Sequence, residues 1–162
     1  MTVPLHPCVR AYVGLGANLG EPVAALQAAL CGLAATPGVE AVRASSFYRS
    51  APVDAGGPWY VNAVAELDTT LTAPALLATL QALEQAAGRE RPYRNAPRTL
   101  DLDLLLYGNA RIDSPQLTVP HPRLWTRAFV LHPLHELAPE RVSARALAAV
   151  ADQAIERCDP PA

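Results

Sequence analysis

The sequence of 162 residues contains no lysine, and all 13 of its basic side chains are arginine. A P-loop is therefore excluded, because its G-x-x-x-x-G-K-[ST] motif needs a lysine on the nucleotide phosphates. Schiff-base chemistry and a lysine general base are excluded for the same reason. Any anion site in this chain must use arginine, backbone N–H groups, histidine or a bound metal.

Charge and long apolar runs are also scarce. Charged residues make up only 17% of the chain and the net charge is −2, which argues against a general nucleic-acid binder. The hydrophobic content of 51% argues against disorder. No apolar run reaches the roughly 18 residues of a membrane span, and residues 1–7 lack the regions of a secretion signal. We therefore expect no nucleic-acid or membrane partner.

Cysteine is rare as well, and its three positions are far apart: Cys8, Cys31 and Cys158. They form neither a C-x-x-C pair nor a disulfide framework. Cys31 lies in a stretch rich in alanine and leucine, where we expect it to be buried as a small hydrophobe. Unpaired cysteines are typical of a reducing compartment, so we expect a cytoplasmic protein. The length suits one domain over residues 1–162, and we expect a monomer.

Hydrophobic periodicity predicts an alternation of strands and helices over the first two thirds of the chain. The predicted strands are Val9–Gly16, Val39–Arg49, Trp59–Leu67 and Thr99–Tyr107, and the predicted helices are Pro22–Ala35 and Thr72–Gly88. The order β-α-β-β-α-β is typical of the α+β ferredoxin-like fold, an antiparallel sheet with both helices on one face. C-terminal additions follow, namely an apolar run over Phe129–Leu137 and a helix over Ala144–Arg157.

The most informative short motif is Asp101-Leu102-Asp103, inside the fourth predicted strand. Residues i and i+2 of a strand project from the same face, with Cα atoms about 6.5–7 Å apart. Leu100, Leu102 and Leu104 then face the helices. Paired carboxylates repel and aspartate is depleted from strands, but Mg²⁺ held also by substrate phosphates would favour the pair. A solvated strand face is the alternative, because D-x-D alone is a weak pattern.

An arginine-rich segment precedes the aspartates and contains Arg89, Arg91, Arg94 and Arg98. Guanidinium groups bind phosphate oxygens in a bidentate way. Carboxylates for a metal next to arginines for phosphate are the equipment of phosphoryl transfer, where positioning and charge neutralisation dominate. The alternative is a solvated loop whose arginines pair with Glu84 and Glu90.

Three further features are less specific. His121 lies between Pro120 and Pro122, which restrict its backbone, although a single histidine is more often structural than functional. Tyr60 and Asn62 share one strand face and could stack on and hydrogen-bond a flat heterocycle, but two core or surface residues would look the same. The segment from Gly14 to Gly20 is not a G-x-G-x-x-G motif, because the last glycine comes one residue late.

Several segments together resemble the 6-hydroxymethyl-7,8-dihydropterin pyrophosphokinase family. The central one runs from Pro97 to Leu105 as Pro-Arg-Thr-Leu-Asp-Leu-Asp-Leu-Leu and is followed by Tyr107-Gly108. Further matches occur in order along the chain, at Gly16–Gly20, Ser45–Ser50, Tyr60–Ala63, Leu117–His121 and Arg127–Leu131. The agreement covers nearly the whole chain, which makes chance similarity a poor explanation.

The resemblance implies a ferredoxin-like fold and transfer of the β,γ-diphosphate of ATP to the pterin hydroxymethyl group, releasing AMP, in folate synthesis. It implies ATP as co-substrate, two Mg²⁺ ions bound by Asp101 and Asp103, and Arg89 and Arg98 as catalytic arginines. The positions that match ATP contacts are Gln81, Glu84, Arg91, Thr118, His121 and Arg127. The positions that match the pterin pocket are Ser50, Val53, Tyr60, Asn62 and Phe129.

Two departures from the family pattern are visible. Asn95-Ala96 occupies the place of an aromatic residue and a glycine, and Pro122 replaces a bulky residue after the histidine. Tyr93 and Trp125 are the candidates to replace the aromatic. Two other readings compete: an RNA-binding module would need basic charge and aromatic residues on its sheet, and an inactive relative would not need the aspartate pair.

Overall fold

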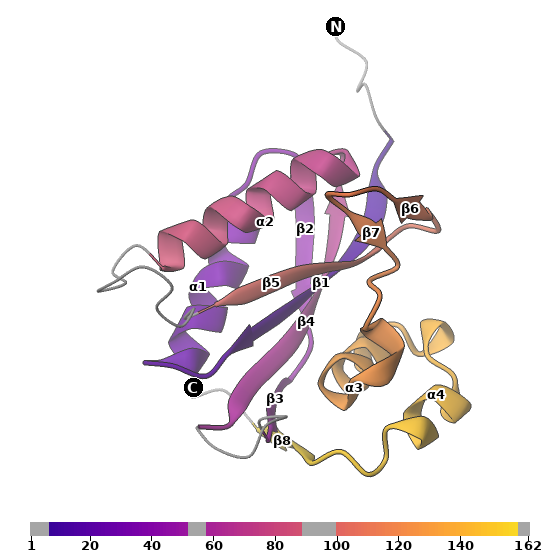
Figure 1. Cartoon of the computed structure of the whole chain (residues 1–162). Helices are drawn as coiled ribbons and strands as arrows, with labels where there is room; N and C mark the ends of the chain where they lie inside the picture. Colours follow the sequence, from indigo (N-terminus) through magenta and orange to yellow (C-terminus); the bar gives the residue numbers. More distant parts are fainter. Residues whose placement is uncertain (1–6, 52–57, 89–99, 159–162) are drawn as a thin grey trace, which may run out of the picture.

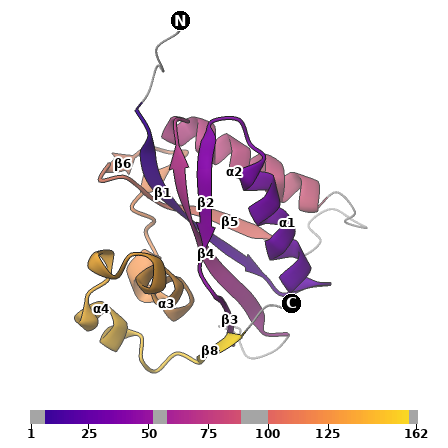
Figure 2. The same ribbon diagram turned by 180° about the vertical axis from the view of Figure 1, so that it is seen from behind.

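The computed structural model describes residues 7–51, 58–88 and 100–158. They form a six-stranded antiparallel sheet covered by helices on both faces, and a separate two-stranded sheet (Figures 1 and 2). The strands run in the order β5-β1-β4-β3-β8. Strand β2 also pairs with β4, further along it than β3 does. Their bounds are β1 (Val9–Ala17), β2 (Val39–Ala44), β3 (Phe47–Ser50), β4 (Tyr60–Thr69), β5 (Asp101–Tyr107) and β8 (Ile155–Cys158).

Helices α1 (Pro22–Ala34) and α2 (Ala73–Ala87) cover one face, as the ferredoxin-like prediction requires (Figure 1). The α+β fold prediction is confirmed. Each helix begins where its sequence predicts. Pro22 is the first residue of α1, and the Thr72 hydroxyl caps α2 by accepting a hydrogen bond from the Ala75 N–H at 3.2 Å.

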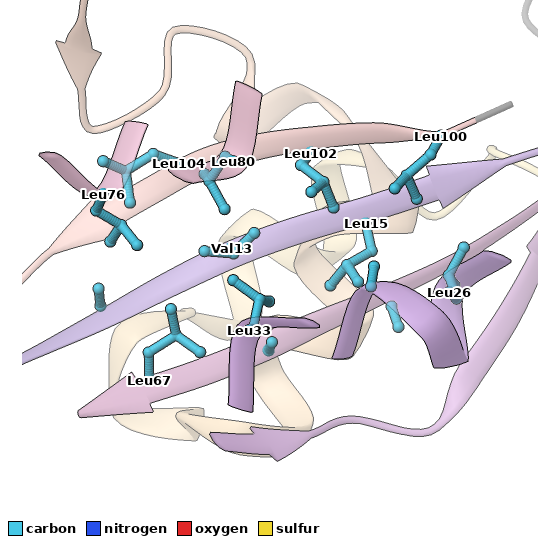
Figure 3. Close-up of a cluster of buried hydrophobic side chains, with 14 of the residues drawn as sticks. Val13, Leu15, Leu26, Leu33, Leu67, Leu76, Leu80, Leu100, Leu102 and Leu104 are labelled. Atoms are coloured by element: carbon cyan, nitrogen blue, oxygen red, sulfur yellow. The ribbon is translucent and has the colours of Figure 1, made fainter. Parts of the chain in front are cut away.

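Alternating apolar residues form the main core between the sheet and these two helices (Figure 3). From the sheet, Leu100, Leu102 and Leu104 of the β5 region and Val13 and Leu15 of β1 point towards the helices. All five are at most 4% exposed, so the predicted orientation of the three leucines is confirmed. With the leucines on this side, strand alternation directs Asp101 and Asp103 to the opposite face.

Helix α3 (Ala128–Leu137) covers that opposite face and packs against β3 and β4. A second apolar cluster lies beneath it, with Tyr12 and Val64 from the sheet and Leu131 and Leu134 from α3. Helix α4 (Ala144–Ala149) packs beside α3. Between β5 and α3 lie the hairpin of β6 (Ile112–Asp113) and β7 (Thr118–Val119) and the short helix η1 (Leu124–Thr126); η2 (Pro139–Arg141) follows α3.

The predicted strand Val39–Arg49 is wrong as one element, because it is broken at Ser45 and Ser46 into β2 and β3. The Ser45 hydroxyl accepts a hydrogen bond from the Val64 N–H at 3.0 Å and so replaces a backbone acceptor in the ladder. One extra residue here shifts the alternation, as a β-bulge does. Phe47 therefore points into the main core and Tyr48 towards α3.

This bulge anchors α3 through Glu136. The Glu136 carboxylate accepts hydrogen bonds from the Ser46 N–H and hydroxyl at 2.8 and 3.2 Å and from the Tyr48 hydroxyl at 2.8 Å. Burial alone would raise the pKa of Glu136, but these hydrogen bonds and nearby Arg157 lower it below its ordinary value of 4.5. Burial and the same carboxylate raise the pKa of Tyr48 to about 12.

Two predictions about the C-terminal third and the cysteines are wrong. The helix predicted over Ala144–Arg157 ends at Ala149, and Ile155–Cys158 instead forms β8, which pairs with the open side of β3. Backbone pairing at a sheet edge there outweighs the local helix propensity of the alanines. Cys31 is exposed rather than buried, because it lies on the outer side of α1. Within residues 7–51, 58–88 and 100–158, no helix combines the length and apolar character needed to cross a membrane.

Glu136→Gln is expected to lower the free energy of unfolding at pH 7, since a neutral amide is a weaker acceptor than a carboxylate. Because the folded pKa of Glu136 is lowered, its contribution is complete above the unfolded value and is lost as the pH falls through the folded value. The difference between variant and wild type in urea unfolding should therefore shrink below about pH 4.5. Glu40→Gln, at an exposed position of β2, is the control. A Glu136→Gln difference that stays constant down to pH 3 would contradict this account.

Candidate active site

A cavity of about 440 Å³ opens on the α3 face of the sheet, between the strand ends and the first turn of α3. Eight of the residues singled out from the sequence line it: Ser50, Tyr60, Asn62, Glu84, Asp101, Asp103, Arg127 and Phe129. They come from β3, β4, β5, both helix layers and the residue that precedes α3. The fold therefore brings together residues that are up to 79 positions apart in the chain, from Ser50 to Phe129.

Two glycines of β1 form the floor of this cavity. Gly16 pairs with Asn62 of β4 on one side and with Asp101 of β5 on the other, and Gly14 pairs with Asp103. Paired residues of antiparallel strands project on the same face, so the missing side chains leave open space between the carboxylates and the Asn62 amide. A Cβ atom on Gly16 would lie 3.1 Å from Asn62 Nδ2.

Sequence reasoning missed this role of Gly14 and Gly16, because it compared them with a nucleotide-binding glycine motif and with the family pattern but did not consider which strand face they share. The available signal was their alternation. Tyr12, Gly14 and Gly16 share one strand face, and the two glycines follow a residue that is buried under α3. Two glycines at neighbouring positions of the same covered strand face leave a hollow that larger side chains would fill.

The aspartate pair stands beside this floor. Asp101 is exposed, and the Asp103 side chain is 47% exposed. Among the residues that the structure describes, strand β5 is at the edge of the sheet, so one row of its N–H groups has no strand partner there. The Glu84 carboxylate of α2 accepts a hydrogen bond from one of these groups, the Leu102 N–H, at 2.9 Å. Glu84 thereby fixes the backbone between the two aspartates.

The donor set fits a magnesium site completed by other ligands. In the part of the chain that the structure describes, no group of three or more histidine, cysteine, aspartate or glutamate residues could hold a metal. Asp101 and Asp103 nevertheless offer hard carboxylate oxygens that face the same cavity. Mg²⁺ is commonly held by one or two carboxylates while water and substrate phosphates supply its remaining ligands.

His121 reaches Asp103 through an irregularity in β5. Leu105 has no pairing partner in β1, because Tyr12 pairs with Leu106 and Val13 with Leu104. The Leu105 carbonyl accepts a hydrogen bond from the His121 N–H at 3.0 Å. His121 Nε2 then lies 3.9 Å from Asp103 Oδ1, while Nδ1 accepts a hydrogen bond from the Arg123 N–H at 3.1 Å. The Val119–Pro120 peptide bond just before it is cis.

Burial lowers the pKa of His121 below its ordinary value of 6.5; Asp103 opposes this effect, while Arg127 and Arg123 add to it. His121 is therefore neutral near pH 7. Because Nδ1 accepts a hydrogen bond, the single proton of the neutral ring belongs on Nε2, the nitrogen that faces Asp103. In this state the Nε2–H faces Asp103 Oδ1 at 3.9 Å, which is too long for a hydrogen bond.

The opposite side of the cavity combines a fixed amide with an aromatic ring. Ser50 and Asn62 are each 4% exposed, and the Ser50 hydroxyl donates to Asn62 Oδ1 at 2.6 Å. This bond commits the amide oxygen and leaves the Nδ2 donors near Gly16 and the cavity. The Arg127 guanidinium lies 5.2 Å from the centre of the Phe129 ring, which is close enough for a cation–π contact.

The other singled-out residues lie elsewhere. Gln81 on α2 and Thr118 on β7 are exposed, and neither they nor His121 lines this cavity. Trp125 is 45% exposed in η1 and does not line it either. The remaining predictions lie outside the described residues: Val53, Arg89, Glu90, Arg91, Tyr93, Arg94, Asn95, Ala96 and Arg98.

Known proteins provide an independent comparison. A family model described as 7,8-dihydro-6-hydroxymethylpterin-pyrophosphokinase (HPPK) matches residues 12–139. A Pseudomonas aeruginosa protein named 2-amino-4-hydroxy-6-hydroxymethyldihydropteridine pyrophosphokinase is 49% identical over 132 residues, which are 81% of this chain and 82% of the relative. A Synechocystis protein of the same name is 46% identical over 138 residues, which are 85% of this chain and 71% of the relative.

Solved structures agree on the fold. The chain superposes on a crystal structure of wild-type Plasmodium falciparum HPPK-DHPS with SDX-DHP with a TM-score of 0.62 at 13% sequence identity. The match covers 86% of this chain and 43% of that one, so the chain spans about two fifths of the solved protein. The family model covers most of the chain, and the named relatives are well above 30% identical over more than two thirds of it. The chain belongs to the 7,8-dihydro-6-hydroxymethylpterin-pyrophosphokinase family.

Proposed function

We propose that this chain transfers the diphosphate of ATP to the hydroxymethyl group of 6-hydroxymethyl-7,8-dihydropterin and releases AMP, a step of folate synthesis. One observation carries the proposal beyond the family match. The aspartate pair, Asn62 and Phe129 face one cavity across a floor of two glycines. Phosphates on the aspartate side and a flat heterocycle on the amide side would then lie next to each other, as transfer between them requires.

On the phosphate side, Asp101 and Asp103 would hold two Mg²⁺ ions, which would neutralise phosphate charge and lower the pKa of the attacking hydroxyl. Arg89 and Arg98 are the proposed catalytic arginines, which offset charge on the transferring groups. The proposed ATP contacts are Gln81, Glu84, Arg91, Thr118, His121 and Arg127. Among these, Glu84 acts on the backbone of β5 and His121 as a neutral donor.

The protein groups near the phosphates are poorly suited to take the proton from the attacking hydroxyl. Arginine keeps its proton at any working pH. His121 carries its proton on the nitrogen that faces Asp103, and its other nitrogen already accepts from the Arg123 N–H. This arrangement supports activation of the hydroxyl at the aspartates rather than by a histidine base.

On the pterin side, Ser50 orients the Asn62 amide so that its Nδ2 donors face the heterocycle edge. Phe129 and Tyr60 provide aromatic surface for stacking, and Val53 is proposed to contribute main-chain contacts. Arg127 connects the two sides, because its guanidinium lies over Phe129 while its charge is available to the phosphates.

We also propose that the protein acts as a cytoplasmic, single-domain monomer on small soluble substrates. The three cysteines are free, which suits a reducing compartment. Sedimentation of the purified chain tests the oligomeric state.

The activity is tested by following AMP released from ATP and Mg²⁺ with and without 6-hydroxymethyl-7,8-dihydropterin. AMP is expected only when the pterin is present, together with an equal amount of the pterin diphosphate detected by mass spectrometry. Release of ADP, or release of AMP that does not depend on the pterin, would contradict the proposed reaction.

Asp101→Asn and Asp103→Asn are each expected to lower kcat/KM at least about 100-fold, because a metal ion stabilises the transition state by several kcal/mol. Thermal unfolding should change little, since both side chains are at least partly exposed. Asp113→Asn, at an exposed position of β6, is the control. Normal turnover in either aspartate variant would overturn the metal assignment.

Gly16→Ala is expected to raise KM for the pterin about tenfold, which corresponds to the loss of roughly one hydrogen bond. The new methyl would lie 3.1 Å from Asn62 Nδ2 and displace the amide that Ser50 orients. Gly14→Ala should have a smaller effect, because its methyl meets Leu105 at an ordinary 3.5 Å. Equal KM values for the two variants would show that the Gly16 contact is not the cause.

A further inference from the structure

Gln153 makes a contact that the function described above does not use. It lies in the turn between α4 and β8, and its amide binds the backbone on both sides of Arg127. Its Oε1 accepts a hydrogen bond from the Ala128 N–H at 2.8 Å, and its Nε2 donates to the Thr126 carbonyl at 2.9 Å. One side-chain amide from 25 residues along the chain thus holds the two residues that flank Arg127.

This contact supplies a cap that α3 lacks. The first N–H groups of a helix have no partner within the helix, and a side-chain acceptor just before the helix usually satisfies one of them. At α3 that position is Arg127, whose side chain makes no such hydrogen bond. A guanidinium has no acceptor atom, so Arg127 cannot cap the helix itself, and the Gln153 amide oxygen provides the acceptor instead. The Arg127 guanidinium lies over the Phe129 ring.

The same turn is also fixed to the pterin side of the cavity. The Ala51 N–H donates to the Ala154 carbonyl at 3.4 Å, and Ile155 pairs with Ser50 in the β3–β8 ladder. Ser50 in turn orients Asn62. Residues 153–155 therefore connect the side of the cavity that bears Arg127 with the side that bears Ser50.

A second cavity of about 520 Å³ adjoins the first and places Gln153 at the site itself. Gln153 lines it together with Ser50, Arg127 and Phe129, and the last three also line the first cavity. The amide is thus next to the space where substrates would lie and not in a remote part of the fold.

We infer that Gln153 is a positioning residue of the active site, which sets the direction of Arg127 and Phe129 by clamping the backbone around them. The inference rests on the proposed function, since it assigns these two residues to ATP and pterin. Arg127 has extended backbone angles, with φ −124° and ψ 119°, and the clamp fixes the peptide groups before and after it. Without the clamp, the guanidinium and ring keep their chemistry but lose their fixed orientation, so ligand affinity falls and the transfer step itself is little affected.

Gln153→Met tests the inference, because methionine keeps the length of the side chain and removes both hydrogen bonds. The expected result is a rise of about tenfold in KM for ATP with kcat within about twofold of wild type, because Arg127 must then be ordered when the ligand binds. Gln27→Met, at an exposed position of α1, is the matched control and should leave both constants unchanged. Hydrogen exchange of the Ala128 amide should become faster in Gln153→Met only.

Two results would overturn the inference. In one, KM for ATP and kcat of Gln153→Met both equal those of wild type. In the other, kcat and the thermal midpoint fall while KM stays the same, which would mean that the clamp only stabilises the fold. Failure of the proposed function is recognised separately, by a wild-type chain that releases no AMP. In that case the exchange rate of the Ala128 amide decides, and an unchanged rate in Gln153→Met would overturn the clamp.

Discussion

The alternation of side chains along β1 and β5 is the constraint on which the molecule depends. One set of residues, including Val13, Leu102 and Leu104, packs against α1 and α2 and forms the main core. The other set, including Gly14, Gly16 and the two aspartates, faces the cavity. Burial of the leucines therefore fixes the aspartates on the other face, because a shift of one residue would exchange the two sets. The stability of the fold and the placement of the proposed site therefore depend on the same strand register of β1 and β5.

That register is supplemented by local irregularities that place individual groups. The extra residue at Ser45 and Ser46 turns Tyr48 towards α3, where Glu136 accepts its hydroxyl hydrogen bond. The skipped residue Leu105 in β5 frees a carbonyl that holds the His121 backbone beside Asp103. At each bulge, a residue without a regular strand partner thus leaves groups that bind the segment on the α3 face of the sheet.

The sequence was sufficient for the βαββαβ core, since apolar alternation, proline at the first turn of α1 and the Thr72 cap are local signals. It was also sufficient to single out the aspartate pair, because carboxylates in a strand interior contradict local preference. The bulges, β8 and the glycine floor could not be obtained in this way. They depend on which strands are neighbours: the Ser45 hydroxyl matters only opposite Val64, Gly16 only opposite Asn62, and Ile155 only beside Ser50.

The absence of lysine matters more because His121 is neutral, since arginine is then the main source of positive charge among the protein groups near the cavity. A lysine or a protonated histidine near phosphate would have a charge that changes with its surroundings, whereas the arginine charge is constant at working pH. His121 is neutral because burial and two arginines outweigh the attraction of Asp103. Positive charge from protein groups near the cavity thus comes from guanidinium groups whose effect depends on direction, since their donors form a rigid planar fork. The strength of phosphate binding then depends more on how the guanidinium groups are oriented than on their charge, which is constant. Gln153, which fixes the backbone on both sides of Arg127, acts on that orientation.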